Sequence, residues 1–503
     1  MNSLHALDDV VIVAYFAIMI GIGFWSMRRT KNREDYLVAG RRLGFPMFFG
    51  CMAALAVGGA VTVGGTGKGY GDGLAGIWVG GSLGMGLIAL GMLISSKLNR
   101  LRALSVNEVI ERNDGPLARV FGATLTIIYT ISLTVVQIVS MGAIVSGLFN
   151  LSNTVSMVLA GCVVVFYTFL GGMWSVTMTD IVQFVVETLG IVILVPIFVL
   201  SSPRIGGLSG LLDKVPSTHW DMGAYGFSGT LYWILLYVPG LVIGQDIWQR
   251  VFTAHDERIA KRGTILAGFY SILYSLCAVF LDIAVLAAGI KLDDPSLAFE
   301  AGVSAFLPTG VAGLLLAAAL AACTSVSSGT ILACSTTVYN DVYLRFVRGV
   351  KSFDGGAHEV AHDAEGNVTA SPDVWINRGI ALRIGVLTIV LAVAISDIFK
   401  ALDLAYGYLS GCVFVPVFFS FVLKRISPRA GLVSLGLFAL TVAGTMAYGE
   451  STGQADFAIS GNWPITFGIV VGLISYLLVT ALDHHKGVPA IEIDESEAAA
   501  LDA

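Results

Sequence analysis

Two short stretches, Ala56-Val57-Gly58-Gly59-Ala60 and Tyr237-Val238-Pro239-Gly240-Leu241, interrupt long apolar runs with residues that break helices. Glycine lowers helical stability, and proline in a helix interior removes a backbone hydrogen bond. Each stretch lies near the middle of its run, so each predicts an unwound point halfway across a membrane. Transporters place such broken helices at matching positions of two inverted halves, with the binding site between them. The pair of stretches predicts this architecture here.

The composition is that of a membrane protein along its whole length. Of the 503 residues, 56% are hydrophobic and 13% are charged, whereas soluble proteins carry about 25% charged residues. The charges are clustered and leave apolar runs of roughly 18 residues or more, which are long enough to span the hydrocarbon core as helices. The runs do not alternate, which favours helices over a barrel. We therefore predict an all-α integral membrane protein.

We expect about thirteen transmembrane helices. Their approximate limits are 8–27, 47–70, 74–96, 117–148, 155–171, 179–200, 229–247, 264–290, 308–340, 380–398, 402–423, 430–449 and 462–482. The two breaks fall on the second and seventh spans, which predicts two inverted halves of five spans each. The predicted divisions are an extra N-terminal helix and loop (1–45), the first repeat (46–202), the second repeat (228–424), extra C-terminal helices (425–485) and a disordered cytoplasmic tail (486–503).

The distribution of basic residues predicts the orientation. With an outer N-terminus, the outer side holds five of the 29 Lys and Arg residues, and the other 24 lie inside; the five are Lys68, Arg204, Lys214, Lys291 and Lys400. Basic residues concentrate in cytoplasmic loops. We expect a multi-pass protein of the cell (cytoplasmic) membrane, with its N-terminus outside, its C-terminus inside and a retained first span.

Four segments resemble the sodium/solute symporter family. They are Glu34-Asp35-Tyr36-Leu37-Val38-Ala39-Gly40-Arg41-Arg42-Leu43-Gly44, Gly171-Gly172-Met173-Trp174-Ser175-Val176-Thr177-Met178-Thr179-Asp180 with Gln183, Gly244-Gln245-Asp246-Ile247-Trp248-Gln249-Arg250, and Ala321-Ala322 running to Asn340-Asp341-Val342-Tyr343. The resemblance extends to about residue 430. It implies a LeuT-type inverted repeat of five plus five helices with one helix before it and further helices after it, and symport of a solute with sodium.

The resemblance also implies a sodium site. Carbonyl groups of Ala54 and Val57 at the first break, and Ala322 with the Ser325 hydroxyl on the partner helix, match the family's ligand positions. Hard cations prefer such oxygen ligands. The second hydroxyl position is Val326, which cannot supply one. A second cation site, present in some members, is matched by Asp180 and Ser328. Sodium is expected as the coupling ion, and no other cofactor is expected.

The solute is expected to bind beside the two breaks. The candidate residues are Gly58, Gly59, Gln137, Tyr237, Pro239 and Gly240. The glycines leave space, Gln137 supplies a donor and an acceptor, and Tyr237 can stack on a solute or bond to it. Packing is the alternative role for each side chain. Proline carriers of the family use aromatic residues where Val238 and Val242 appear here, which disfavours proline.

Glu187 lies two helical turns beyond Asp180 within an apolar run. A carboxyl group at that depth is costly, and it is a candidate proton carrier. Its alternative role is that of a neutral group joining helices. Asp282 lies nearer the outer end and is expected to be structural. A proton-coupled symporter using Glu187 therefore remains open, as does a channel or sensor without coupled transport.

The remaining motifs carry less information. The HExxH pattern from His358 to His362 lies in a charged loop, without the apolar helix that a zinc protease needs, so no enzyme activity is expected. Asn150-Leu151-Ser152 is a candidate glycosylation site, and the segment from Gln245 to Arg250 is expected to reach the inner surface. The expected partners are a small-molecule solute and the lipid bilayer, with no nucleic acid and no obligate protein partner.

Overall fold

The computed structural model describes most of the chain. The described residues are 6–101, 103–149, 151–349, 361–362, 368–369, 371–395, 398–423, 425–427, 429–458, 461, 463–486 and 491–492. Asn150 and the first three residues of the HExxH pattern lie outside them, as does most of the predicted tail.

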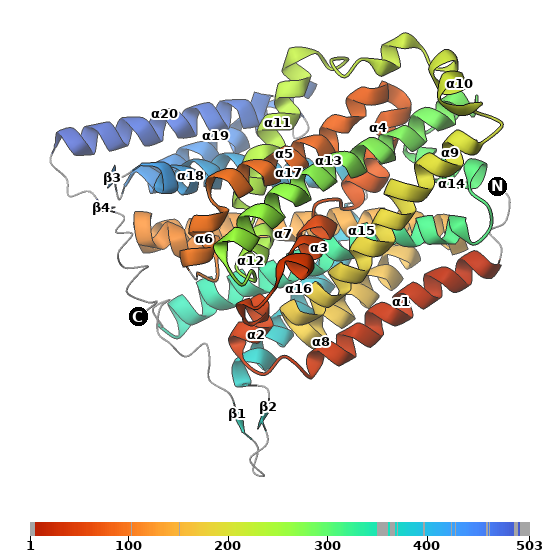
Figure 1. Cartoon of the computed structure of the whole chain (residues 1–503). Helices are drawn as coiled ribbons and strands as arrows, with labels where there is room; N and C mark the ends of the chain where they lie inside the picture. Colours follow the sequence, from red (N-terminus) through yellow and green to blue (C-terminus); the bar gives the residue numbers. More distant parts are fainter. Residues whose placement is uncertain are drawn as a thin grey trace.

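Almost all of the described chain is helical (Figure 1). The helices of the first half are α1 Ala6–Met27, α2 Arg33–Val38, α3 Phe45–Leu55, α4 Gly65–Asp72, α5 Trp78–Leu93, α6 Ser95–Leu101, α7 Val106–Phe149, α8 Asn153–Glu187, α9 Val195–Ser201 and α10 Gly207–Lys214. Those of the second half are α11 Gly226–Ile243, α12 Gln245–Val251, α13 Glu257–Ala287, α14 Ala298–Phe306, α15 Val311–Thr336, α16 Pro372–Ala394, α17 Ile398–Tyr408, α18 Phe414–Val422, α19 Ala430–Thr452 and α20 Trp463–His485.

Wider π-helical turns continue several of these helices. They are Ala60–Gly64 before α4, Thr188–Leu194 between α8 and α9, Thr337–Val347 after α15 and Leu409–Val413 between α17 and α18. Two antiparallel strand pairs complete the described structure, β1 Ala361–His362 with β2 Val368–Thr369 and β3 Arg425–Ile426 with β4 Ile491–Glu492.

All thirteen predicted spans lie on helical segments, but the described residues form ten helical stretches, including two kinked at a glycine, that are long and apolar enough to cross a membrane. The difference comes from how the segments join. The predicted spans 155–171 and 179–200 are parts of one helical stretch that turns at Gly172, where φ is 56° and ψ is −140°. This backbone conformation is open to glycine because it has no Cβ. The spans 47–70 and 402–423 are each divided into shorter pieces.

The two ends of the bundle differ in character. In Figure 1, α1 begins on the right, near α10 and α14, and α20 ends on the left, where α2 and α6 also lie. Ion pairs connect the predicted inner segments to one another. Arg100 on α6 lies 2.7 Å from Glu257 on α13, and Arg345 lies 2.5 Å from Glu111 on α7. These ion pairs join segments that were predicted to share one side of the membrane; the orientation itself stays a prediction.

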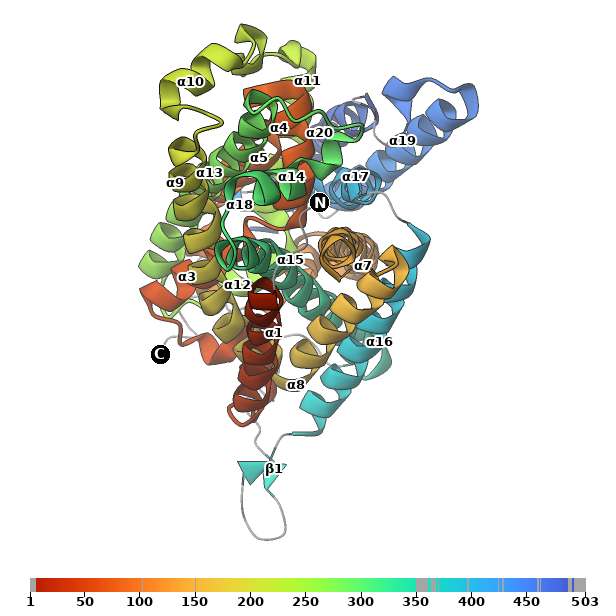
Figure 2. The ribbon, with the colours of Figure 1, turned by 90° about the vertical axis from the view of Figure 1, so that its right-hand side faces the viewer.

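Figure 2 shows the bundle turned by 90°, with α7 and α17 seen nearly end-on. Helices α7 and α15 lie in the middle of the bundle, α1 lies at one edge, and α19 and α20 lie together at another. Nearly every residue of α15 is buried, although the helix carries many hydroxyl groups. A helix that is polar and yet buried in a membrane protein faces other helices or a cavity rather than lipid.

The first predicted break is confirmed and the second lies elsewhere. Helix α3 ends at Leu55, and regular helix resumes beyond Gly58. Helix α11, in contrast, continues through Pro239 to Ile243, so the predicted break at Tyr237–Leu241 is wrong. The chain leaves the helix at Gly244, where ψ is 127°, and α12 begins at Gln245. Membrane helices tolerate proline because neighbouring groups and small adjustments satisfy the freed carbonyl.

Candidate solute and cation site

The first break is held open by backbone bonds to side chains. The amide N–H of Gly59 donates to Oε1 of Gln137 on α7 at 2.6 Å, and the hydroxyl of Thr62 donates to the Val57 carbonyl at 2.9 Å. A Cβ atom added at Gly59 would lie 2.6 Å from the Cβ of Ser140 and 2.7 Å from Sγ of Cys323. Glycine is therefore required here by close approach, and the predicted meeting of Gln137 with the break is seen.

Helix α15 covers the other side of the first break. Cγ2 of Val326 lies 2.7 Å from the position that a Cβ at Gly58 would take, so Val326 fills the space against the break. Ala54 lies in the last turn of α3, where helix carbonyls have no partner within the helix. Ala322 is buried on α15, one residue before Cys323. Three of the four predicted positions for the first sodium ion, Ala54, Val57 and Ala322, thus lie on the segments that meet here.

The fourth position, Ser325, belongs to a buried polar cluster around Asp180. The Ser325 hydroxyl donates to Oδ1 of Asp180 at 2.7 Å. Oδ2 accepts from Sγ of Cys51 at 3.0 Å and from Nη2 of Arg250 at 2.9 Å. Neither charged side chain is more than 1% exposed. The Ser328 hydroxyl is one turn away and donates to the Ser325 carbonyl at 3.0 Å.

Arg250 is the residue in this cluster that the sequence did not point to. The segment from Gln245 to Arg250 was expected to reach the inner surface, but its charged side chains are buried, with Asp246 2% and Arg250 1% exposed. The guanidinium group of Arg250 packs against Gly329, which has no side chain in its way. It neutralises Asp180 from within the protein, in the place where a second cation was expected.

A small cavity of about 30 Å³ lies between the two breaks. Its wall includes Ala56 and Gly58 from the first break and Asp246 and Ile247 from the start of α12. Leu55, Ala60 and Val61 flank the first break, and Leu241 comes from α11. The other lining residues are Leu83 on α5, Leu133 and Gln137 on α7, Val326 on α15, and Leu402 and Tyr406 on α17. A space of this size holds only one or two water molecules. A solute therefore requires the wall to move apart.

The predicted residues of the second break lie behind this wall. Tyr237 is fully buried and packs edge-on against Tyr406, with ring centroids 5.0 Å apart. A Cβ at Gly240 would lie 2.5 Å from Tyr406, so the glycine makes room for that ring. Neither these two residues nor Pro239 lines the cavity. Asp246 and Tyr406 line the cavity instead. A prediction that placed the second break at Gly244 would have identified Asp246 as a candidate cavity residue.

Glu187 lies apart from the cavity, within the helix bundle. Its side chain is fully buried, and neither carboxyl oxygen has a hydrogen-bond partner among the described residues. Asp282 on α13 has the same two properties, and it packs against Gly69 of α4. A charged carboxylate without a partner is very costly in such surroundings, so both groups are uncharged in this conformation.

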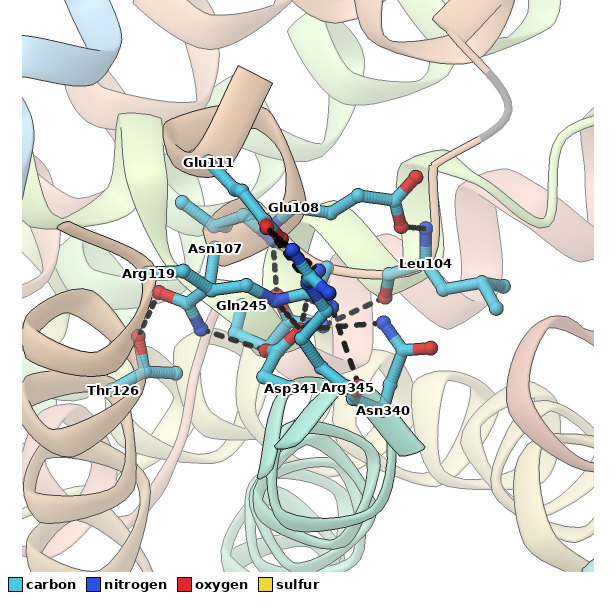
Figure 3. A network of polar contacts seen from close by, with 12 residues as sticks. Leu104, Asn107, Glu108, Glu111, Arg119, Thr126, Gln245, Asn340, Asp341 and Arg345 are labelled. Carbon is cyan, nitrogen blue, oxygen red and sulfur yellow. Dashed lines mark hydrogen bonds and ion pairs between the residues drawn. The ribbon is translucent and has the colours of Figure 1, made fainter. Parts of the chain in front are cut away.

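A network of polar groups joins three segments on the inner side of the second break (Figure 3). Nη2 of Arg119 on α7 lies 2.7 Å from Oδ1 of Asp341, which follows α15. Gln245, the first residue of α12, bridges the loop before α7, since its Oε1 accepts from the Val106 amide at 2.8 Å and its Nε2 donates to the Leu104 carbonyl at 3.1 Å. The network ties these segments together at the end of the bundle that is predicted to face inward.

The arrangement of two broken helices around a buried cavity agrees with the comparisons. The model of the sodium:solute symporter family matches residues 36–437. The chain belongs to the sodium:solute symporter family. This symporter is 25% identical to the sodium/proline symporter of Escherichia coli over 466 residues, covering 86% of each chain. It is 22% identical to the high-affinity choline transporter 1 of Drosophila melanogaster, covering 78% of this chain and 62% of the relative.

Solved structures show the same fold. The structure of a sodium-coupled sialic acid symporter aligns with a TM-score of 0.77 at 17% identity, covering 97% of this chain and 100% of that one. The nucleobase-cation-symport-1 family transporter Mhp1 aligns with a TM-score of 0.54 at 15% identity, covering 92% and 97%. The predicted LeuT-type fold is confirmed. The protein is a multi-pass, sodium-coupled solute symporter and not an enzyme.

Proposed function

We propose that this symporter moves a small polar organic solute by alternating access, through the cavity between the two breaks. The coupling sodium ion binds where the carbonyl groups of Ala54 and Val57 face Ala322 and Ser325. Asp180, whose charge Arg250 balances, and Ser328 lie beside this site through their bonds to Ser325. The protein resides in the cytoplasmic membrane with its N-terminus outside. Gly58, Gly59 and Gln137 shape the solute cavity, and Tyr237, Pro239 and Gly240 support its aromatic wall from behind.

The observation that carries this proposal is the position of the first break. Its backbone is unwound over Ala56–Gly58, deep in the protein, and it faces the turn of α15 that contains Cys323 and Val326. Unwound backbone supplies carbonyl oxygen ligands that carry no full charge. Such ligands suit a monovalent cation that binds on one side of the membrane and is released on the other. The closed network on the inner side and the small cavity describe an occluded state of such a cycle.

Uptake into proteoliposomes tests the proposal. With sodium outside and potassium inside, a transported solute should accumulate above its outer concentration, and dissipating the sodium gradient should abolish accumulation. The variant Ser325→Ala removes the hydroxyl at the α15 position and should raise the sodium concentration needed for half-maximal uptake. Accumulation that is indifferent to sodium would refute the proposal.

A second candidate, proton coupling through Glu187, is favoured by one observation. Both carboxyl oxygens of Glu187 are buried without partners, so this group holds a proton in the occluded conformation. A proton-coupled symporter would lose the pH dependence of uptake in Glu187→Gln while remaining indifferent to sodium. Measuring uptake over a grid of external sodium concentration and pH separates the two.

A further inference from the structure

The cavity between the two breaks carries a chemical preference of its own. Among the described residues that line the cavity, Asp246 is the one acidic side chain. The only other titratable group on that lining is the phenol of Tyr406. No Lys, Arg or His lines the cavity in the part of the chain that the structure describes. An anionic solute would thus meet a carboxyl group and no countercharge, which disfavours it strongly in buried surroundings.

The carboxyl group of Asp246 is held as a hydrogen-bond acceptor. The hydroxyl of Tyr129 donates to its Oδ1 at 3.0 Å. No basic side chain forms an ion pair with it among the described residues, because the nearby guanidinium group of Arg250 is bound to Asp180. Asp246 is therefore left without an ion-pair partner of its own among the described residues, and a cationic group in the cavity would supply one.

The rest of the wall suits an organic cation rather than a bare metal ion. Tyr406 lines the cavity beside Asp246, and its ring is fixed by edge contacts to Tyr129 and Tyr237 at 5.4 and 5.0 Å between centroids. Aromatic rings attract ammonium groups, most strongly where water is excluded. Leucine side chains complete the wall, and they pack against methyl or methylene groups. Oε1 of Gln137 is occupied by the Gly59 amide, which leaves its Nε2 to donate to a solute oxygen.

We propose that the solute is a small organic cation, with an ammonium group that binds Asp246 beside the ring of Tyr406 and an uncharged oxygen that faces Gln137. This inference rests on the proposed function, because it assigns the chemistry of the same cavity. Asp246 is then the residue that determines specificity for charge, and Arg250 keeps Asp180 from competing for the solute.

Three probes of nearly equal shape separate the charge of the ligand from its size. Choline is a cation. In 3,3-dimethylbutan-1-ol a carbon atom replaces the nitrogen, so the molecule is uncharged. In glycine betaine a carboxylate stands in place of the hydroxymethyl group, so the molecule is a zwitterion. The purified symporter in nanodiscs is titrated with each probe in sodium chloride, and the midpoint of thermal unfolding is followed, because a ligand of the native state raises it. Choline should bind at least about tenfold more tightly than either of the others, which corresponds to about 1.4 kcal/mol.

Matched variants locate the preference. Asp246→Asn should remove the preference for choline, whereas Asp282→Asn, which changes another buried acid outside the cavity, should keep it. The inference is overturned if the alcohol or the betaine binds as tightly as choline, if choline does not bind in sodium, or if Asp246→Asn retains the preference. Sodium alone should raise the unfolding temperature of the native protein and of Asp246→Asn. If sodium raises the unfolding temperature of neither protein, the proposed function itself fails.

Discussion

The two breaks differ in how they are made and in what they offer to cargo. The first is made by Gly58 and Gly59 within apolar surroundings, and it exposes uncharged backbone groups near Val57. The second is made at Gly244 and is followed at once by Gln245 and a buried acid, Asp246. The comparison teaches that the two halves present different chemistry to the same cavity. The first break offers uncharged backbone groups, and the second offers a carboxyl group next to Gln245, which ties α12 to the start of α7.

The largest loss of stability is expected from removing the guanidinium group of Arg250, which lies on α12 after the second break and pairs with Asp180. Arg250→Ala leaves Asp180 buried without its partner, and breaking a buried ion pair on one side costs about 3–5 kcal/mol. We expect a much lower yield of folded protein and a lower unfolding temperature in detergent. The double variant Arg250→Ala with Asp180→Ala should recover part of the lost stability. If the single variant Arg250→Ala and the double variant are equally unstable, the ion pair between Arg250 and Asp180 is not what stabilises this region.

The glycines of the first break should be next in effect. Gly59→Ala places a methyl group against Ser140 and Cys323, and such overpacking costs about 1–3 kcal/mol. We expect lower stability and weaker activation of uptake by sodium. Gly65→Ala is the matched control, because the nearest atom to its added Cβ is 3.6 Å away. If both variants behave alike, close approach at Gly59 is not what holds the break.

Gln137→Ala tests the contact between α7 and the first break. It leaves the Gly59 amide without its acceptor, and an unsatisfied buried donor costs about 1–3 kcal/mol. Solute uptake should fall, while Gln137→Glu, which keeps an acceptor oxygen, should retain the break. Thermal unfolding with and without sodium measures the difference. A fully active Gln137→Ala variant would show that the contact is dispensable.

These expectations mark what local sequence can and cannot predict. The contact of Gly59 with Gln137, 78 residues away, does not follow from local sequence. The helices and the first break follow from apolar runs and from paired glycines, which act over a few residues. The second break does not, because it depends on Gln245 bonding to Leu104 and Val106, about 140 residues away in the chain. Its wrong assignment to Pro239 also hid Asp246 among residues expected at the surface.

The same limit applies to pairs of charges. Asp180 was predicted as a cation ligand from its resemblance to the family, and its bond to Arg250 joins two helices 70 residues apart. Tyr406 carried no local signal at all, since an aromatic residue in an apolar helix most often packs in the interior. Only the folded arrangement shows that it lines the cavity.

The smallest effect is expected at Glu187, which belongs to neither break. Because its carboxyl group is already uncharged, Glu187→Gln replaces one neutral group by another of the same shape, and sodium-driven uptake should stay within about twofold. Uptake measured from pH 5.5 to pH 8.5 should show no change in its pH profile. A profile that becomes flat in this variant would favour proton coupling instead.

The most direct measurement is the accessibility of the cavity from outside. The variant Leu133→Cys, on the cavity wall, is labelled with a membrane-impermeant thiol reagent in membranes with and without sodium, in a protein whose exposed Cys162 is replaced by serine. Gln454→Cys, exposed in the connection between α19 and α20 that is predicted to lie outside, serves as the control. Sodium should speed labelling at position 133 and leave position 454 unchanged, since ion binding at the first break favours the outward-open state. Labelling at position 133 that is unaffected by sodium would contradict the account.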